Sequence, residues 1–454
     1  MMDSGRSQQI LSTLQTFFSE PLTDRIQRAI TTPAQESLLA LFHSVVQTVP
    51  AYRTFLSQYG IDPESVQSLD TFQQLPLTTK ANYLQQHPLS QLCRQGSLAG
   101  CDMIAVSSGS TGQPTFWPRL ITDELHIATR FEQIFRDSFQ ADRRSTLAVI
   151  CFALGTWVGG LYTASCCRWL AAKGYSITVI APGNNKTEIL RVVQALGDQF
   201  EQVVLLGYPP FLKDVIDTGI QQGVTWSQYS VKWVMAGEVF SEEWRSLVGQ
   251  RLGSTDFYHD SASLYGTADA GVLGNETPLS ICIRRFFSEH PATARQLFGG
   301  SRLPTLVQYD PSSRFFEVHE GTLLFSGDNG IPLIRYHIAD TGGIISSEAM
   351  LEFLRDCGFD PLTILHKSDR TEVHPLPFVY IFGRSQFVLS YFGANLYPEN
   401  ISVGLEQPVV QEWVTGKFVM EIREDSDQNR SLSITVELAP GIEPEEEKEG
   451  AITQ

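Results

Sequence analysis

With 454 residues and a mass of 50.6 kDa, the chain is too long for one ordinary hydrophobic core, so two or more folding units are expected. A hydrophobic content of 42% and a charged content of 18% are typical of a globular protein. The net charge of −17 excludes a basic nucleic-acid-binding surface and disfavours binding to an anionic membrane. It still allows a small anionic ligand, because a few backbone N–H groups can bind a phosphate locally.

Cysteine usage predicts a reducing compartment, so we expect the protein in the cytoplasm. The chain has seven cysteines, an odd number with no CxxC pair, and most lie among apolar residues as buried thiols do. Histidines and cysteines are scattered along the chain, which does not favour a structural zinc site. The first ten residues, MMDSGRSQQI, contain no apolar run and do not resemble a secretory signal.

The first 60 residues are predicted to be helical, because apolar side chains recur every three or four positions, as from Ile10 to Phe18 and from Leu38 to Val45. The segment 75-LPLTTK-80 resembles a turn that leads into a helix cap. Strand-like and helical runs then alternate. The strands are expected at 103–107, 147–152, 176–182, 202–207 and 231–237, and the helices at 122–139, 158–172, 186–200 and 209–222. This alternation predicts an α/β fold in which helices cover parallel sheets.

An uncharged stretch from Ser145 to Cys167 is long enough to span a bilayer. Three glycines, Gly155, Gly159 and Gly160, interrupt it. A strand at 147–152, a turn and a buried helix from residue 158 explain the stretch better, because a membrane helix would not need the glycine turn. We therefore expect no membrane span.

The alternation of strand-like and helical runs ends near residue 279. Short, turn-bounded runs such as TLLFS and PLIRYHI are typical of an antiparallel or barrel-like unit. After 383-GR-384 a second α+β pattern follows, with FVLSYFG, a helix near 398–406, FVMEIRE and LSITVELAP. The acidic tail EPEEEKEG either begins a helix or is disordered. The predicted domains are a large N-terminal one over residues 1–383 and a small C-terminal one over 384–454.

The stretch 107-SSGSTGQPTFWPR-119 follows a predicted strand and is rich in hydroxyl groups and glycine. Such a turn can direct backbone N–H groups and hydroxyls at phosphate oxygens, and Gly109 and Gly112 permit close backbone approach. It is not a Walker A loop, because no Gly-Lys-Ser/Thr follows. A solvated linker is the alternative, although the aromatic TFWPR that follows must be buried somewhere.

Four more stretches carry groups suited to binding or catalysis. They are 236-AGEVF-240, 258-YHDSASLYGTADAG-271, 333-LIRYHIADTGG-343, and 382-FGRSQF-387 with 393-GANLYPENI-401. A carboxylate at the end of a strand can hold a ligand in an open α/β sheet, and an aspartate can also accept bonds from ribose hydroxyls or hold Mg²⁺. Ordinary strand-to-helix turns, polar loops with core tyrosines and capping residues are the alternatives for each stretch taken alone.

The order and spacing of these stretches resemble the adenylate-forming enzymes, and within them the phenylacetate–CoA ligase-like branch. The family's phosphate loop SSGTTGKPT resembles residues 107–115, with Gln113 at the usual lysine. The other matches are LPxTTK at 75–80, the glycine-rich turn at 155–160, GGE at 236–238, YGxSE at 265–269, IRYRTGD at 334–340, and GRSDDM with RGVNVFPxxIE at 383–388 and 392–401. The resemblance runs from about residue 50 to about residue 440.

This resemblance implies an α/β adenylate-forming fold with a small α+β C-terminal lid that looks truncated. It implies that ATP activates a carboxylic acid to an acyl-adenylate, which then passes to CoA or to the phosphopantetheine of a carrier protein. Mg²⁺ is the expected metal, and an aromatic or other apolar acid is expected because Trp157 lies in the glycine turn. Members of this branch are often dimers, so a homodimer is expected.

The resemblance also assigns roles to individual residues. For the β,γ-phosphates these are Ser107, Ser108, Gly109, Ser110, Thr111 and Gly112. The adenine would lie between Tyr265 and Gly237–Glu238, the ribose on Asp340, with Gly266 and Arg384 as further nucleotide contacts. The catalytic residues would be Thr267, at the α-phosphate, and Asp269, on Mg²⁺. The acid pocket would be lined by Trp157, Tyr208, Ala236 and Ser261.

Several departures from the family pattern bear on activity. Gln113 removes a positive charge, Asp269 is one methylene shorter than the usual glutamate, and Gln386 replaces a frequent hinge aspartate. The late lid lysine of the family is not matched, since Lys417 and Lys448 lie in other contexts. Loss of one cation at a transition-state charge costs about a hundredfold in rate or more, so slow or absent adenylation is expected. The alternative function is therefore a nucleotide- or adenylate-binding protein that no longer catalyses.

Overall fold

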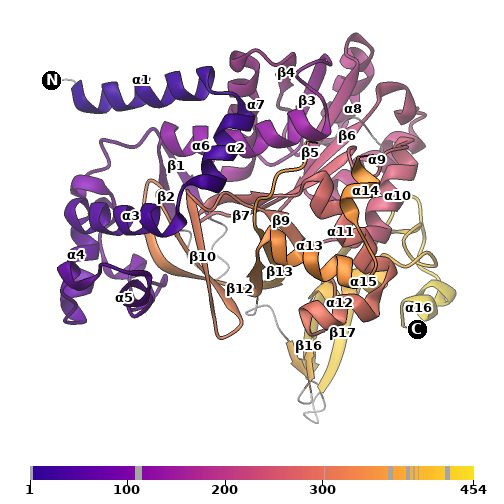
Figure 1. The fold of residues 1–454 in the computed structure, drawn as a ribbon. Helices are drawn as coiled ribbons and strands as arrows, with labels where there is room; N and C mark the ends of the chain where they lie inside the picture. The colour runs from indigo at the N-terminus through magenta and orange to yellow at the C-terminus, as the bar shows by residue number, and fades with distance from the viewer. Residues whose placement is uncertain are drawn as a thin grey trace.

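The structure is a computed structural model of the chain. It describes residues 4–107, 115–300, 302–366, 372–384, 389–391, 394–396, 398–424 and 430–453. Its centre is an 11-stranded sheet in the order β10-β11-β12-β13-β9-β8-β7-β6-β5-β3-β4 (Figure 1). A mixed α/β architecture is thus confirmed.

One half of the sheet is parallel and carries helices on both faces. Its strands are β3 (Thr146–Ile150), β4 (Ile177–Ile180), β5 (Gln202–Gly207), β6 (Lys232–Ala236) and β7 (Ser261–Thr267). Side chains of alternate residues enter separate cores, as in β3, where Ala148 and Ile150 face one core while Leu147 and Val149 face the other. The first core contains α6 (Ile121–Gln133) and α7 (Val158–Lys173), and the second contains α8 (Lys186–Leu196), α9 (Pro209–Gln221) and α10 (Glu242–Leu252).

The other half of the sheet is antiparallel. It contains β8 (Gly271–Asn275), β9 (Thr305–Gln308), β10 (Arg314–His319), β11 (Thr322–Gly327), β12 (Leu333–Ile345) and β13 (Phe378–Arg384). The predicted antiparallel strands are therefore present, but they continue the parallel half of the same sheet. In the described residues this sheet is open, with β10 and β4 at its edges, so these strands do not form a separate barrel.

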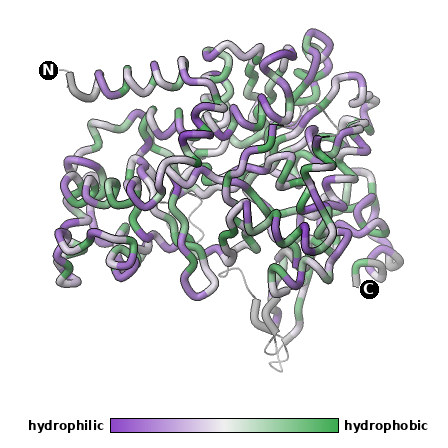
Figure 2. Tube along the Cα trace, in the orientation of Figure 1, coloured by the Kyte–Doolittle hydropathy of each residue, from purple (hydrophilic) through white to green (hydrophobic). Residues whose placement is uncertain are grey.

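Two N-terminal helices, α1 (Ser4–Ser19) and α2 (Leu22–Thr31), pack on α6. The helices around the antiparallel half are α3 (Ala34–Thr48), α4 (Pro50–Gln58), α5 (Leu69–Gln73), α11 (Pro278–Glu289), α12 (Pro291–Phe298), α13 (Ser347–Asp356) and α14 (Pro361–Leu365). The predicted helical character of the first 60 residues is confirmed. Figure 2 shows hydrophobic stretches among the central strands, while the outer helices carry more hydrophilic residues.

A hairpin of β1 (Met103–Val106) and β2 (Phe116–Arg119) forms a small antiparallel sheet of its own. The strand at β3 and the helix α7 confirm that the uncharged stretch near Gly155 is a strand, a turn and a helix. Among the described helices, none combines the length and the apolar character that crossing a bilayer requires. All seven cysteines are free thiols, five of them buried and Cys357 exposed.

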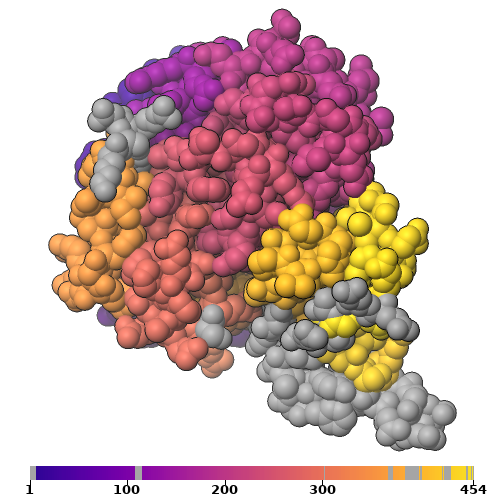
Figure 3. Space-filling model, turned by 90° about the vertical axis from the view of Figure 1, so that its right-hand side faces the viewer, coloured from indigo at the N-terminus to yellow at the C-terminus, as the bar shows by residue number. Residues whose placement is uncertain are grey.

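The residues after Arg384 form strands outside the large sheet. These are β14 (Leu389–Tyr391) with β15 (Ala394–Leu396), and β16 (Val414–Glu424) with β17 (Arg430–Leu438), together with α15 (Pro398–Leu405) and α16 (Glu446–Thr453). Figure 3 shows this C-terminal part, in yellow, against the magenta and pink part of the chain. Lys213 of α9 donates to the Val414 carbonyl at 2.7 Å, and Arg251 of α10 pairs with Glu412 at 2.9 Å. The C-terminal unit is therefore docked on α9 and α10.

Candidate functional site

The β1–β2 hairpin holds together the two ends of the predicted phosphate loop. The Ser107 N–H donates to the Thr115 carbonyl at 3.0 Å, and the Thr115 N–H donates to the Ser107 Oγ at 3.2 Å. Ser108, Gly109, Ser110, Thr111, Gly112 and Gln113 lie outside the described residues. The Val106 N–H donates to the Thr156 carbonyl at 3.0 Å, which places the predicted glycine turn beside the start of the loop.

Lys80 joins the hairpin to the second predicted motif. Its ammonium nitrogen lies 3.4 Å from Asp269 Oδ1 and 5.8 Å from the centre of the Trp117 ring of β2. Tyr336 of β12 donates to Asp269 Oδ2 at 2.6 Å. Asp269, the predicted Mg²⁺ ligand, is buried between a cation and a phenol. A role for Lys80 was not predicted, although it ends the LPLTTK motif that the sequence singled out.

Tyr265 and Asp340 are brought into direct contact, although 75 positions separate them. The Tyr265 hydroxyl donates to Asp340 Oδ2 at 2.6 Å, and both side chains are buried. Such a short bond to a carboxylate is charge-assisted and fixes the orientation of the acceptor. In the β12–β13 register Asp340 lies opposite Arg384, another predicted nucleotide contact. The predicted adenine and ribose groups therefore lie at one place in the fold.

Strand β12 is bonded to Thr78 and contains two residues with positive φ. Thr78, fully buried, donates through its N–H to the Arg335 carbonyl at 3.1 Å and through its hydroxyl to the Ile334 carbonyl at 2.8 Å. Its own carbonyl accepts from the His337 N–H at 2.9 Å. Arg335 and Ala339 both have positive φ, at 45° and 68°. Positive φ is costly for such residues, and strain of this kind clusters at functional sites.

The turn after β7 is fixed by its own residues and by the hairpin. Thr267, a predicted catalytic residue, accepts at Oγ1 from the Ala270 N–H at 3.0 Å. A side chain on Gly266 would place its Cβ 2.7 Å from the Gly271 carbonyl oxygen, so glycine is needed where β7 meets β8. The Arg119 guanidinium of β2 donates to the Ala268 carbonyl. The turn that carries Asp269 is thus attached to the β1–β2 hairpin.

The predicted acid pocket centres on Tyr208 and the turn after β6. Gly237 has a φ of 94°, and a Cβ built on it would overlap the ring of Tyr208, so the ring lies directly against the glycine backbone. Partial burial, and then the nearby Glu238 carboxylate, raise the pKa of the Tyr208 phenol, which keeps it protonated at neutral pH. Tyr208 is 41% exposed and Trp157 is 44% exposed, so each presents an aromatic surface. Ala236 ends β6 beside this turn.

Ser261, the fourth residue predicted for the acid pocket, is far less exposed than Trp157 and Tyr208. It begins β7, six residues before Thr267, a separation of about 20 Å along an extended strand. Its side chain is fully buried and accepts from Arg245 Nη1 at 2.7 Å. The same guanidinium bonds Glu242 and Glu276, so Ser261 belongs to a buried charged network beneath α10. The other end of the same motif, from Tyr265 to Asp269, makes the contacts with Asp340, Tyr336 and Lys80 described above.

Comparisons with known proteins bear on this arrangement. No family model matches the chain. The sequence is 24% identical over 375 residues to a phenylacetate–coenzyme A ligase of Thermus thermophilus, covering 82% of this chain and 74% of that protein. The fold matches 2-hydroxyisobutyryl-CoA ligase in its postadenylation state, with a TM-score of 0.64 at 15% identity, covering 93% of this chain and 80% of that one. The same ligase in its thioesterification state gives a TM-score of 0.58, at 16% identity and the same coverage.

The chain is thus similar in sequence to a phenylacetate–coenzyme A ligase and shares the fold of 2-hydroxyisobutyryl-CoA ligase. The contacts described above link the stretches that resemble the motifs of adenylate-forming enzymes. The hairpin, the turn after β7 and strand β12 carry the family's phosphate, metal and ribose motifs, and they are linked to one another by Lys80, Arg119, Tyr336 and the Tyr265–Asp340 pair. The roles of the single residues remain predictions.

Proposed function

We propose that this adenylate-forming protein activates a carboxylic acid with ATP and transfers the acyl group to a thiol. Two sets of contacts between distant motifs carry the proposal. Lys80 lies between Asp269 and Trp117 of the β1–β2 hairpin, and Tyr265 bonds Asp340. Motifs that are far apart in the sequence thereby share one site. A nucleotide laid across it has hydroxyl and N–H donors for its phosphates and a carboxylate for its sugar.

The reaction proceeds in two displacements. A carboxylate oxygen of the acid attacks the α-phosphorus of ATP, the bond to the bridging oxygen breaks, and pyrophosphate leaves. The thiolate of CoA or of a carrier-protein phosphopantetheine then attacks the acyl carbonyl, and AMP leaves with the electrons of the C–O bond. Because little covalent chemistry is asked of the protein, its contribution is positioning and charge stabilisation around phosphorus.

Mg²⁺ fits the site through Asp269. Mg²⁺ is usually held by one or two carboxylates together with substrate phosphates, and Asp269 presents a buried carboxylate on a turn attached to the β1–β2 hairpin. The metal would neutralise charge on the phosphates. Lys80 and Arg119 add positive charge to the same turn, and in this proposal they offset the lysine that Gln113 replaces.

The acid that fits best is aromatic or otherwise apolar. Trp157 and Tyr208 present exposed ring surfaces, and Phe152 packs edge-on against Tyr208 with 5.1 Å between ring centres. Flat rings of this kind stack on flat apolar substrates. Neither ring decides between CoA and a carrier protein as the acceptor, so both belong in the test.

Pyrophosphate release, measured over a panel of aryl, branched and linear acids with and without CoA, tests the proposal. We expect release with at least one aryl acid, and a loss of at least tenfold in kcat/KM for Asp340→Asn. The matched control is Asp328→Asn, which removes a carboxylate paired on the surface with Arg94. Turnover that is unchanged by Asp340→Asn would overturn the assigned site, and a panel without any turnover would overturn the activity.

A second function, nucleotide binding without catalysis, is favoured by one observation. In the described residues after Arg384, Lys417 pairs with Glu437 at 2.9 Å and Lys448 pairs with Glu445 at 3.0 Å. Lys417 also lies 3.6 Å from Asp214 of α9, so both lysines are already paired with carboxylates. Calorimetric binding of ATP without pyrophosphate release for any acid would select this function.

A further inference from the structure

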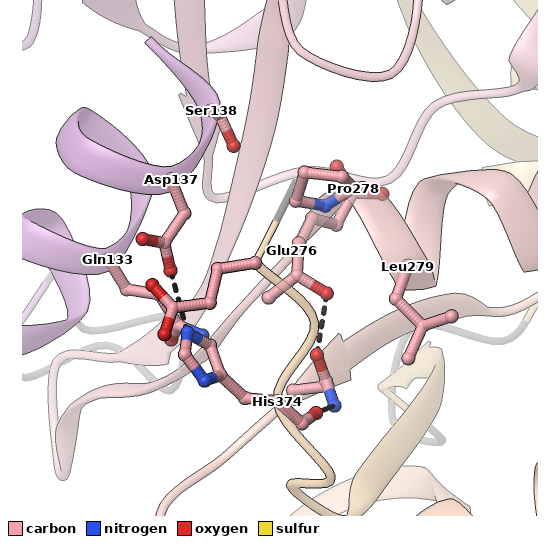
Figure 4. A pocket seen from close by; sticks show the side chains of 10 residues that line it. Gln133, Asp137, Ser138, Glu276, Pro278, Leu279 and His374 are labelled. Atoms are coloured by element: carbon pink, nitrogen blue, oxygen red, sulfur yellow. Dashed lines mark hydrogen bonds and ion pairs between the residues drawn. The ribbon is translucent and has the colours of Figure 1, made fainter. Parts of the chain in front are cut away.

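A small cavity lies apart from the proposed nucleotide site, where four segments of the chain meet. It is lined by η5 (Ile134–Ser138), the end of α6, the junction of β8 with α11, β9 and the residues that lead into β13 (Figure 4). η5 is a π-helical turn that continues α6. Such turns are rare and often occur at functional sites. The cavity is polar and has room for a single water-sized species.

Three side chains at this cavity bring metal-binding atoms together. Donor atoms of Asp137, Glu372 and His374 all lie within 4.8 Å of one another, and His374 Nε2 lies 3.0 Å from Asp137 Oδ2. Figure 4 shows the His374 ring facing the Asp137 carboxylate. A search of the described residues for three or more His, Cys, Asp or Glu side chains with this spacing finds this group.

A second observation is independent of these three residues. Glu276 lines the same cavity, is 0% exposed, and its Oε2 has no hydrogen-bond partner within the described part of the chain. The same holds for Ser138 Oγ and Gln133 Nε2, which are also buried at the cavity. Buried polar atoms without partners are costly, and they commonly mark an ion or ordered water. The cavity is therefore built to receive a polar species.

We infer that Asp137, Glu372 and His374 form a binding site for one divalent transition-metal ion, with Zn²⁺ the best match. An imidazole nitrogen with two carboxylate oxygens is a donor set that Zn²⁺ accepts at about 2.0–2.2 Å, whereas Mg²⁺ and Ca²⁺ prefer oxygen alone. Glu276 lines the same cavity but lies outside this three-donor group, so a water would complete the shell. Glu372 is 44% exposed at its side chain, which provides a path for the ion from solvent.

Charge at the site is compatible with a cation. Arg136 contacts Glu372 Oε2 at 2.9 Å and lies 3.7 Å from Asp137 Oδ1, so it partly neutralises the two carboxylates. Each of these carboxylates has a second oxygen, and that of Asp137 faces His374. The ion would connect η5 to the segment just before β13, the strand that ends at Arg384 where the C-terminal unit begins. Its role is therefore structural, fixing β13 within the sheet.

Titration calorimetry of the full, tag-free, chelator-treated chain with ZnCl₂ in excess MgCl₂ tests the inference. We expect one Zn²⁺ per chain, and binding at least tenfold weaker in His374→Ala and in Glu372→Gln. The control is His259→Ala, because His259 also lies 2.9 Å from a carboxylate, that of Asp256, and belongs to no described three-donor group. Zn²⁺ should also raise the melting temperature of wild type and of the control variant.

Each outcome decides the matter. Wild type that binds no Zn²⁺ above Mg²⁺ background overturns the inference, and so does equal binding by wild type, His374→Ala and Glu372→Gln. If His374→Ala fails to fold by circular dichroism, Glu372→Gln supplies the answer, because that side chain is half-exposed and its amide keeps the shape of the carboxylate. Weaker binding in His259→Ala than in Glu372→Gln would move the site elsewhere and also overturn it.

Discussion

Glu406 makes the docking of the C-terminal unit depend on pH. It follows α15 and accepts a hydrogen bond from the Ser241 N–H, at the start of α10, at 3.1 Å. Burial raises the pKa of Glu406 from its ordinary 4.5 to about 7, and the nearby Glu243 adds to this, while the Ser241 bond and Arg284 oppose it. When the unit undocks, this carboxyl returns to water and to its ordinary pKa.

The sign and size of the effect follow from this shift. The docked form keeps its proton up to about pH 7, whereas the undocked form loses it above about pH 4.5. Docking is therefore most stable below pH 4.5 and loses stability as the pH rises to about 7, by roughly 3 kcal/mol at 1.36 kcal/mol per unit. Glu406→Gln cannot ionise, so above pH 7 it should stabilise docking by up to that amount.

Limited proteolysis between the two units measures the undocked population when redocking is fast. The protease's own activity also changes with pH, so at each pH the cleavage rate of wild type is divided by the cleavage rate of Glu406→Gln, and the protease's pH dependence cancels. This ratio should rise at least tenfold between pH 5.5 and pH 8. For Glu412→Gln, an exposed carboxyl on the same interface, the ratio should stay constant, since surface pairs contribute about 0–1 kcal/mol. A flat ratio for Glu406→Gln would refute the reasoning.

Two further substitutions test the proposed site. Tyr265→Phe removes the 2.6 Å bond to Asp340, which is worth about 1.5–3 kcal/mol for a charged acceptor, so calorimetry should show at least tenfold weaker ATP binding. The control Tyr52→Phe removes a hydroxyl that has no partner among the described residues, so this variant should bind ATP as wild type does. Equal losses of ATP affinity in the two variants would contradict the assignment of Tyr265. Gly237→Ala must displace the adjacent tyrosine ring and should raise the KM for the acid more than Gly223→Ala does. Gly223 also has a positive φ, 83° against 94°, but a Cβ on it would meet nothing within 4 Å. Equal KM values would contradict a place for the tyrosine ring in the acid pocket.

Much of the parallel half of the fold was predictable, because its signals are local. The runs at 147–152, 202–207 and 231–237 are apolar enough to be strands buried on both faces, and the structure confirms them as β3, β5 and β6. Helix α11 was not predicted. Nine of its 12 residues are buried, Arg284 among them, so only Arg285, Ser288 and Glu289 near its end form a polar face that could mark a helix.

The site was predictable as a set of motifs but not as a set of contacts. Local spacing identified Asp269 and Asp340, whereas nothing near Lys80 indicates that its ammonium reaches Asp269, 189 positions away. Ser261 was grouped with the site because it is near Tyr265 in the sequence. It lies in the same motif as Tyr265, but a strand carries residues four positions apart to places about 13 Å from one another.

The order of strands in the large sheet has a consequence for synthesis of the protein. Strand β13 is inserted between β12 and β9, although it is the last of the 11 strands to leave the ribosome. Until about residue 384 has emerged, β9 and β12 expose unpaired edges, and such edges invite aggregation. The nascent chain should therefore need chaperone protection late in translation, and a ribosome stalled before Phe378 should carry a sheet that lacks β13 between β12 and β9.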